Sequence, residues 1–384
     1  MIWLAGFWGA LSLVGYVLAG FPLLVTLRAW RAPAVPEPAD PARWPTVSVI
    51  IAARNEVGCI AAKVERVLAV GYPADRLGVI VASDGSDDGT DAAVRALARP
   101  EVHVLSLPRG GKAAALNAAI ERATGEILVF TDANSWFADG ALHALVRPFA
   151  DPTIGGVAGD QRYGAAPAAD GLGDGERAYW SFDRLLKQAE SRGGSTISAT
   201  GAIYAVRREL VDEVPDDVTD DFYISTGVVA AGQRLVFAPD AVAYEPVAGS
   251  AEHEFSRKVR IMTRGLTGVR RRGALLDPRR SGFYALQLLS HKVLRRLVAV
   301  PVIMSMACSI PLARRHALYR AVLAGELAFV AAGSLGLAVR GRALGRHRAL
   351  SIPAYACLVH AAALKAGWNL ARGHRITRWE PPTR

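Results

Sequence analysis

Residues 126–137 read EILVFTDANSWF, and this stretch decides the fold. After Glu126, residues 127–130 are apolar and carry branched or aromatic side chains, which is typical of a buried strand. The apolar run ends at Asp132, and Asn134 follows two residues later. Such a pair either hydrogen-bonds to nearby backbone in a turn, or it supplies the oxygen ligands that Mg²⁺ and Mn²⁺ prefer. The pattern therefore predicts a strand with a polar site at its carboxyl end.

The residues before this stretch repeat the same unit and predict a mainly parallel sheet. Short apolar strands alternate with helices of about ten residues, which is typical of right-handed βαβ units and of an α/β fold. The predicted strands are 47–51, 78–83, 102–105 and 126–130, and the predicted helices lie near 59–70, 88–98 and 113–123.

Polar segments follow three of these strands. They are ARNE at 53–56, DGSDDGT at 84–90 and TDAN at 131–134. Because ligands of open α/β sheets bind outside the carboxyl ends of the strands, we expect these segments to form one site. No Gly-x-Gly-x-x-Gly follows the first strand, and GGKA at 110–113 lacks the remainder of a Walker loop, so neither a nicotinamide cofactor nor ATP hydrolysis is supported.

A second acidic pair, Asp220 and Asp221, precedes a predicted helix near 222–231. Acidic residues are favoured at a helix N-terminus by roughly 0.3–1 kcal/mol each. A carboxylate near other negative groups can also act as a general base, because its proton affinity is raised. The pair alone does not distinguish these two interpretations.

Both ends of the chain are apolar enough to enter a membrane. Residues 1–27 contain no charged side chain, and the first basic residues, Arg28 and Arg31, come after the apolar run, which favours an anchor with its N-terminus outside. Further spans are predicted at 297–313, 317–339 and 349–371. The last contains His360 and Lys365, so a re-entrant or interfacial segment is the alternative.

The net charge of +10 is unevenly distributed. Residues 1–249 carry a net charge of −9 and residues 250–384 carry +19. Because the basic residues accompany apolar helices, they indicate contact with anionic lipid headgroups and argue against nucleic acid. The three cysteines are far apart, which indicates neither a disulfide framework nor a zinc site.

Seven segments occur in a characteristic order: VSVIIAARNE, SDGSDDGT, GGKAAALNAAI, VFTDAN, TGAIYAVRREL, TDDFYIS and RKVRIMTRG. Together they resemble the membrane-bound family-2 glycosyltransferases of the GT-A fold, which include cellulose, hyaluronan and poly-N-acetylglucosamine synthases. The resemblance covers about residues 46–265.

The resemblance implies a role for individual residues. It implies that the donor nucleotide-sugar, expected to be a UDP-sugar, is bound by Ala53, Glu56, Asp84, Lys112, Asp132, Arg257 and Arg260. It implies that Asp132 and Asn134 hold Mg²⁺ or Mn²⁺, although Asn134 replaces the second carboxylate of the family's Asp-x-Asp motif. It further implies that Asp221, with Asp220 beside it, is the base of an inverting transfer, and that Gly201 and Tyr204 lie beside the acceptor.

One motif departs from the family pattern. The Gln-x-x-Arg-Trp motif of processive synthases corresponds here to Arg257-Lys258-Val259-Arg260-Ile261, so the aromatic platform for the acceptor is missing from that position. Trp180 is the candidate that could stack on the acceptor sugar instead. The alternative interpretation is that Trp180 is a core residue. Processive polymerisation is therefore left open.

The predicted organisation has six parts. They are a transmembrane helix (1–27), a Pro-rich linker (28–45), the GT-A domain (46–250), a basic amphipathic interfacial segment (251–296), about three membrane helices (297–371) and a basic tail (372–384).

The expected activity is metal-dependent transfer of a sugar to a polysaccharide or glycolipid hydroxyl. We expect it on the cytoplasmic side of the inner membrane, in contact with membrane lipids and with a synthase or export partner. The alternatives are a single-sugar transferase acting on a lipid carrier and a catalytically silent, sugar-nucleotide-sensing subunit.

Overall fold

The predicted sheet is present in the computed structural model, which describes residues 1–33, 40–164, 173–245 and 251–376. Eight strands form one sheet in the order β3-β2-β1-β4-β7-β6-β8-β5. Their bounds are β1 Val47–Ala53, β2 Leu77–Asp84, β3 Val102–Leu107, β4 Ile127–Asp132, β5 Trp136–Phe137, β6 Ile154–Tyr163, β7 Tyr204–Arg207 and β8 Arg234–Glu245. The four strands predicted from the sequence are confirmed as β1 to β4.

The sheet is parallel in its first half and mixed in its second. Strands β3, β2, β1 and β4 run parallel. Strand β7 is antiparallel to β4 and β6, β6 is parallel to β8, and β5 is antiparallel to β8. The sheet thus changes direction beside β4, where EILVFTDAN ends. This mixed, mainly parallel α/β sheet is the predicted fold class.

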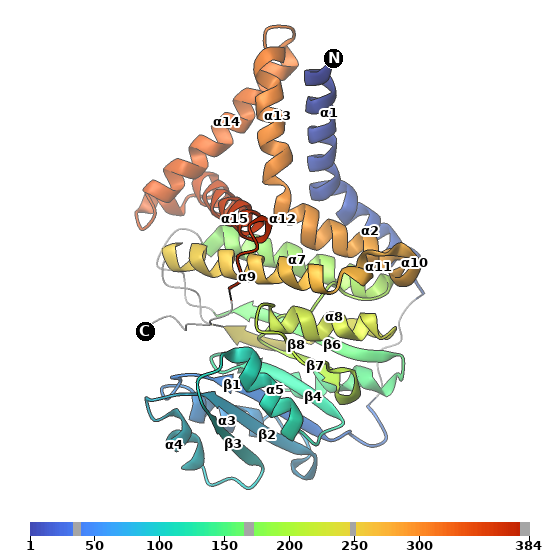
Figure 1. Cartoon of the computed structure of the whole chain (residues 1–384), viewed down its shortest axis with the longest axis vertical. Helices are drawn as coiled ribbons and strands as arrows, with labels where there is room; N and C mark the ends of the chain where they lie inside the picture. The colour runs from blue at the N-terminus through green and yellow to red at the C-terminus, as the bar shows by residue number, and fades with distance from the viewer. Residues whose placement is uncertain (34–39, 165–172, 246–250, 377–384) are drawn as a thin grey trace.

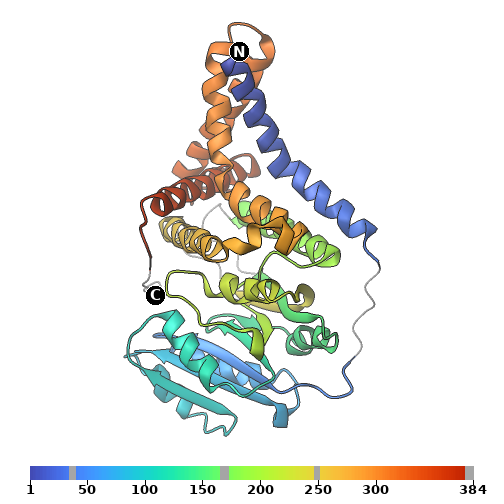
Figure 2. The same ribbon diagram turned by 45° about the vertical axis from the view of Figure 1, so that its right-hand side comes forward.

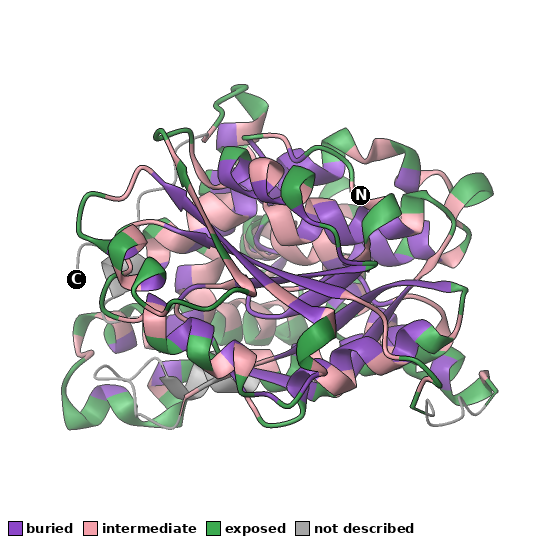
Figure 3. Cartoon of the chain, turned by 90° about the horizontal axis from the view of Figure 1, so that it is seen from below, coloured by how far each residue is buried: buried purple, intermediate pink, exposed green. Residues whose placement is uncertain are grey.

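Helices cover both faces of the sheet, and the strands at the centre are almost fully buried (Figure 3). On one face, Val49 and Ile51 of β1 pack with α3 and α6. On the other face, Ile50 packs with α5 and α8. The alternation of β1 side chains between two cores explains why the strand reads as a continuous apolar run. The helices are α3 Ile60–Leu68, α4 Thr90–Arg95, α5 Lys112–Arg122, α6 Ala141–Val146 and α8 Asp220–Ala230.

The apolar ends of the chain form helices that rise away from the sheet (Figures 1 and 2). In the part of the chain that the structure describes, three helical stretches are long and apolar enough to cross a membrane: Ile2–Arg31, Ala317–Ala338 and Arg348–Ala371. A fourth candidate consists of Phe283–Leu297 and Ala299–Leu312, which are bent by 53°. The elements are α1 Ile2–Gly15, η1 Tyr16–Gly20, α2 Phe21–Arg31, α10 Pro278–Ser281, α11 Phe283–Gln287, η6 Leu288–Leu294, α12 Arg295–Leu297, α13 Ala299–Leu312, α14 Ala317–Ala338 and α15 Arg348–Ala371.

Two long helices, α7 (Gly173–Gly193) and α9 (Ala251–Arg271), lie between the sheet and the apolar helices (Figure 1). Figure 2 shows α15 lying across this layer, whereas α1 and α13 rise beside each other. Met262 and Leu266 of α9 pack against Ala362, Ala363 and Ala366 of α15. The amphipathic helix predicted at the start of 251–296 is therefore covered by the last apolar helix.

Candidate active site

Two of the predicted polar segments, ARNE and TDAN, meet around one cavity of about 1450 Å³, whereas no residue of the third, DGSDDGT, contributes to its wall. The cavity begins at the carboxyl ends of the strands and continues between α7, α9 and the apolar helices. Of the residues predicted from the sequence, ten contribute to its wall: Glu56, Lys112, Asp132, Asn134, Trp180, Gly201, Asp220, Asp221, Arg257 and Arg260. Residues up to about 200 positions apart in the sequence are thus neighbours in one site.

Lys112 joins two of the acidic segments. Its Nζ lies 2.8 Å from Asp132 Oδ1 and 3.0 Å from Asp220 Oδ2. Burial disfavours the charged ammonium, but the two carboxylates outweigh this effect and hold the pKa of Lys112 above its usual value. Burial would likewise raise the pKa of Asp132, but Lys112 lowers it below its usual value. Both groups are therefore charged at neutral pH.

Asp221 has the opposite electrostatic environment. It is the second residue of α8, and its Oδ1 accepts a hydrogen bond of 2.8 Å from the Phe222 N–H. Burial, followed by repulsion from Asp220, raises the pKa of Asp221 to about 6. Lys112 is thus paired with Asp132 and Asp220, whereas Asp221 makes no ion pair with the residues that the structure describes. We call Lys112, Asp132, Asp220 and Asp221 the strand-end cluster.

The backbone at Gly201 lies so close to the Asp132 carboxylate that only glycine fits at this position. A Cβ atom at Gly201 would lie 2.8 Å from Asp132 Oδ2. Since real Cβ atoms do not approach oxygen this closely, a larger residue would displace the carboxylate. The predicted place of Gly201 beside the reacting groups therefore has a steric basis.

Asp84 positions the loop before Lys112. Its Oδ1 accepts hydrogen bonds from the N–H groups of Gly110 (2.6 Å) and Gly111 (2.9 Å). The side chain is buried and does not contribute to the cavity wall. Direct binding of the donor by Asp84 remains a prediction. In the structure, the Asp84 carboxylate holds the backbone of the loop at Gly110 and Gly111. Asp84 fixes the start of α5, which begins with Lys112.

Two predicted residues lie in the core instead of the cavity wall. Ala53 is buried at the end of β1, and its neighbour Ala52 contributes to the wall. Tyr204 is fully buried on β7, where its ring stacks on Phe130 at a centroid distance of 4.9 Å. Burial, and then the negative charge of Asp220, raises the pKa of Tyr204. Tyr204 therefore packs in the core against β4, the strand that carries Asp132, instead of lining the cavity.

The two predicted arginines of α9 differ in their contacts. Arg257 forms an ion pair with Glu254, with Nε 2.8 Å from Oε2. Arg260 lines the cavity and makes no ion pair or hydrogen bond with any residue that the structure describes. Trp180 of α7 also lines the cavity, and Lys258 Nζ lies 5.7 Å from the centroid of its ring. Arg260 is thus available to an anionic ligand.

Sequence reasoning missed Lys63, which is fully buried beneath Asp132. Its Nζ donates hydrogen bonds to Thr131 Oγ1 (2.8 Å) and to the Ser135 carbonyl oxygen (2.6 Å), and burial lowers the pKa of Lys63 to about 7. The available signal was a lysine on the apolar face of the helix IAAKVERVL.

Glu245, at the end of β8, was missed as well. Burial, followed by repulsion from Asp132, raises the pKa of Glu245 to about 7, and Gln161 donates a hydrogen bond to its carboxylate. No sequence pattern singles it out. Glu245 and Lys63 flank the turn that carries Asp132.

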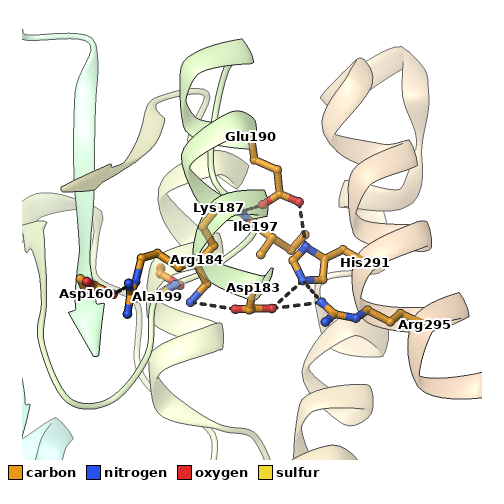
Figure 4. Close-up of polar contacts among 10 residues, drawn as sticks. Asp160, Asp183, Arg184, Lys187, Glu190, Ile197, Ala199, His291 and Arg295 are labelled. Atoms are coloured by element: carbon orange, nitrogen blue, oxygen red, sulfur yellow. Dashed lines mark hydrogen bonds and ion pairs between the residues drawn. The ribbon is translucent and has the colours of Figure 1, made fainter. Parts of the chain in front are cut away.

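A second buried group of charges lies where α7 meets η6 and α12 (Figure 4). Asp183 accepts from Arg295 Nη1 at 3.0 Å and lies 3.5 Å from Lys187 Nζ. His291 Nε2 is 3.2 Å from Asp183, and its Nδ1 is 2.7 Å from Glu190. We call Asp183, Lys187, Glu190, His291 and Arg295 the α7–η6 cluster. It joins the sheet domain to the bent helix that enters the apolar region.

Comparison with known proteins gives a consistent result. Residues 48–214 match the family model described as Glycosyl transferase family 2. An N-acetylglucosaminyltransferase of Rhizobium sp. is 28% identical, and the match covers 60% of this chain and 55% of that protein. A beta-monoglucosyldiacylglycerol synthase of Synechocystis sp. is 29% identical, with coverage of 56% and 47%. The chain spans about half the length of these curated relatives.

A solved structure matches nearly the whole chain. It is a mannosyltransferase from Pyrobaculum calidifontis, in complex with GDP-Man and Mn²⁺. The match has a TM-score of 0.70 and 27% sequence identity, and it covers 94% of this chain and 98% of that chain. The similarity therefore includes the apolar helices as well as the sheet.

Proposed function

We propose that this chain is a membrane-bound inverting glycosyltransferase, because residues 48–214 match the family-2 glycosyltransferase model. It moves a sugar from a nucleotide-sugar to a hydroxyl group of an acceptor that enters from the membrane. The single observation that carries the proposal is the strand-end cluster, in which a carboxylate with a raised pKa shares one cavity with a lysine–carboxylate pair.

Asp221 acts as the general base in this proposal. A base works best when its pKa lies near the working pH, and a pKa of about 6 meets this condition better than that of an ordinary aspartate. The acceptor hydroxyl gives its proton to Asp221 and attacks the anomeric carbon, while the bond to the nucleoside diphosphate breaks on the opposite face. One displacement inverts the anomeric centre.

Lys112 and Arg260 neutralise the departing diphosphate. Both line the cavity, and a guanidinium can meet a phosphate with two parallel hydrogen bonds. Asp132 and Asn134 would hold Mg²⁺ or Mn²⁺, which would add positive charge at the diphosphate when bound. An aspartate and an asparagine in one cavity suit a hard cation that takes its remaining ligands from phosphates and water. The Mn²⁺ in the related mannosyltransferase complex supports this assignment.

The shape of the cavity favours a lipid-linked acceptor. Its wall continues from Asp221 to Val17 and Leu18 of η1 and to Ile352 and Val359 of α15. These residues belong to helices that are candidates for crossing a membrane. A glycolipid or lipid carrier could therefore keep its chains in the bilayer while its hydroxyl reaches Asp221. In this arrangement the sheet domain lies on the cytoplasmic side of the inner membrane.

The test is nucleoside diphosphate release by the purified protein in lipid nanodiscs. UDP-sugars and GDP-sugars are offered with Mg²⁺, Mn²⁺ or a chelator, and a membrane-lipid extract serves as acceptor. We expect metal-dependent release with one donor, its loss in Asp221→Asn, and a product with a single added sugar. A ladder of products would indicate a polymerase. Equal release by wild type and variant with every donor would contradict the proposal and favour the silent subunit.

A further inference from the structure

The proposed base, Asp221, follows a segment that has no regular secondary structure. Residues 211–219 form neither helix nor strand, and α8 begins at Asp220. The backbone carbonyl groups of such a segment lack the partners that a helix or a sheet provides, so the buried ones need a donor from another part of the chain. Whatever holds this segment contributes to the position of Asp221.

Arg264 of α9 provides two of these donors. Its Nε donates to the carbonyl oxygen of Val218 at 2.8 Å, and its Nη2 donates to that of Asp216 at 3.0 Å. Val218 is fully buried, and Arg264 is only 6% exposed. Because a guanidinium is planar and presents its donors in a fixed geometry, two such bonds fix an orientation as well as a distance. Arg264 thus holds the backbone three residues before Asp221.

Two further contacts join α9 to the same region. Arg271 donates two hydrogen bonds of 2.8 Å to the buried carboxylate of Asp217. A Cβ atom at Gly268 would lie 2.9 Å from Cδ1 of Phe222, so the backbone of α9 lies directly against the residue that follows Asp221. The contacts of α9 therefore lie on both sides of the base in the sequence.

The contacts of α9 with this region come from one of its faces, and the opposite face packs against α15 (Figure 1). Arg264, Gly268 and Arg271 are spaced by four and three residues, which places them on the same face of a helix. Met262 and Leu266 lie on the other face and pack against the alanines of α15. The position of the segment before Asp221 is thus tied to an apolar helix through α9.

Arg264 and Arg260 lie one helical turn apart, and both line the cavity, but their contacts differ. Arg260 makes no ion pair or hydrogen bond with any residue that the structure describes, whereas Arg264 donates to backbone carbonyl groups. We propose that Arg264 is a positioning residue, which holds the segment before α8 so that Asp221 meets the acceptor hydroxyl. This inference rests on the proposed function, in which Asp221 is the base.

The test is a double-mutant cycle on the full-length protein in lipid nanodiscs. Arg264→Met removes the donors and keeps an unbranched side chain, and Arg264→Lys keeps a cationic donor. Each variant is made alone and together with Asp221→Asn. The control is Arg207→Met, because Arg207 likewise donates to two backbone carbonyl groups, those of Ile154 and Phe149, and does not line the cavity.

Nucleoside diphosphate release with the donor that supports turnover gives kcat and the KM for that donor, and thermal unfolding gives the stability. We expect Arg264→Met to lower kcat by about 10- to 100-fold, because a displacement of about 1 Å in an active site can cost this much. The KM for the donor should stay unchanged, since the donor is bound by other residues. Arg264→Lys should recover part of the lost rate.

The two comparisons in the cycle separate positioning from stability. In the Asp221→Asn background, Arg264→Met should have almost no further effect on kcat, because the group that it positions is already absent. Arg207→Met should lower the transition temperature by an amount similar to Arg264→Met and leave kcat unchanged. If Arg264→Met does not fold, Arg264→Lys takes its place in the cycle.

Three results would overturn the inference. They are wild-type kcat in the Arg264 variant, an equal loss of kcat in the presence and absence of Asp221, and a raised KM with unchanged kcat, which would assign Arg264 to the donor. Full activity of Asp221→Asn alone would instead contradict the proposed function, so the two failures are distinguishable.

Discussion

The strand-end cluster and the α7–η6 cluster are both buried groups of charges on the same cavity, yet their charges are balanced differently. In the first, Lys112 pairs with Asp132 and Asp220 but not with Asp221. In the second, Asp183 contacts Lys187, His291 and Arg295, and Glu190 contacts His291. An excess of carboxylate leaves one group able to accept a proton, whereas a matched set fixes two elements to each other.

The largest effect should come from removing the uncompensated carboxylate. Asp221→Asn should lower the rate of sugar transfer by roughly 10²- to 10⁴-fold, because a general base contributes about this much. It should not lower the thermal transition temperature, since a raised pKa means that the charged form disfavours folding. Nucleoside diphosphate release and thermal unfolding measure the two effects.

The matched control is Asp212→Asn, a carboxylate that is 60% exposed and pairs with Arg272 beside α8. It should leave the transfer activity unchanged. A similar loss of activity in this control would mean that the effect of Asp221→Asn is not specific.

Removing a charge from the α7–η6 cluster should have the opposite effect, with a large loss of stability and a small loss of activity. Asp183→Asn removes the negative charge shared by Lys187 and Arg295 and leaves two mostly buried cations without it. The expected cost is roughly 3 kcal/mol, or about 4 °C in transition temperature for a protein of this size. Transfer by the protein that remains folded should fall less than tenfold. A fully stable but inactive variant would show that the cluster belongs to the reaction.

A substitution at Gly201 tests whether the position of the Asp132 carboxylate matters for transfer. Gly201→Ala places a Cβ atom against Asp132 Oδ2 and should reduce transfer by about 10- to 100-fold, because a displacement of about 1 Å in an active site can cost this much. Gly194→Ala is the control, since its Cβ would meet nothing within 4 Å. If both variants kept full activity, Asp132 would not need its present position.

The smallest predicted effect is a shift in pH dependence. A base must be deprotonated to act, so kcat/KM should fall as the pH decreases through about 6, the pKa of Asp221. Repulsion from Asp220 contributes to raising that pKa, so in Asp220→Asn the acid limb of the residual activity should move to lower pH. An unchanged limb would indicate that another group, such as Glu245, controls it.

Local patterns gave correct predictions where a few neighbouring residues decide the outcome. The alternation of strands and helices, the polar strand ends and the long apolar helices are all local, because burial imposes a period on each element separately. Several of the motifs follow the same rule: VFTDAN lies at the end of β4, and GGKAAALNAAI and TDDFYIS lie at the starts of α5 and α8. The linker boundary was less accurate, because the first helix continues to Arg31 instead of ending at residue 27.

The sequence by itself therefore determined the fold class, the apolar helices and most of the candidate site. Only the tertiary structure decided which charges share a partner. Lys63 reaches Thr131, and His291 lies between Asp183 and Glu190 about a hundred residues away, because helices from distant parts of the chain pack on the same sheet. Spacing in the sequence does not encode such distances. The raised pKa of Asp221 and the lowered pKa of Lys63 both depend on them, since electrostatic interaction and burial act through space instead of along the chain.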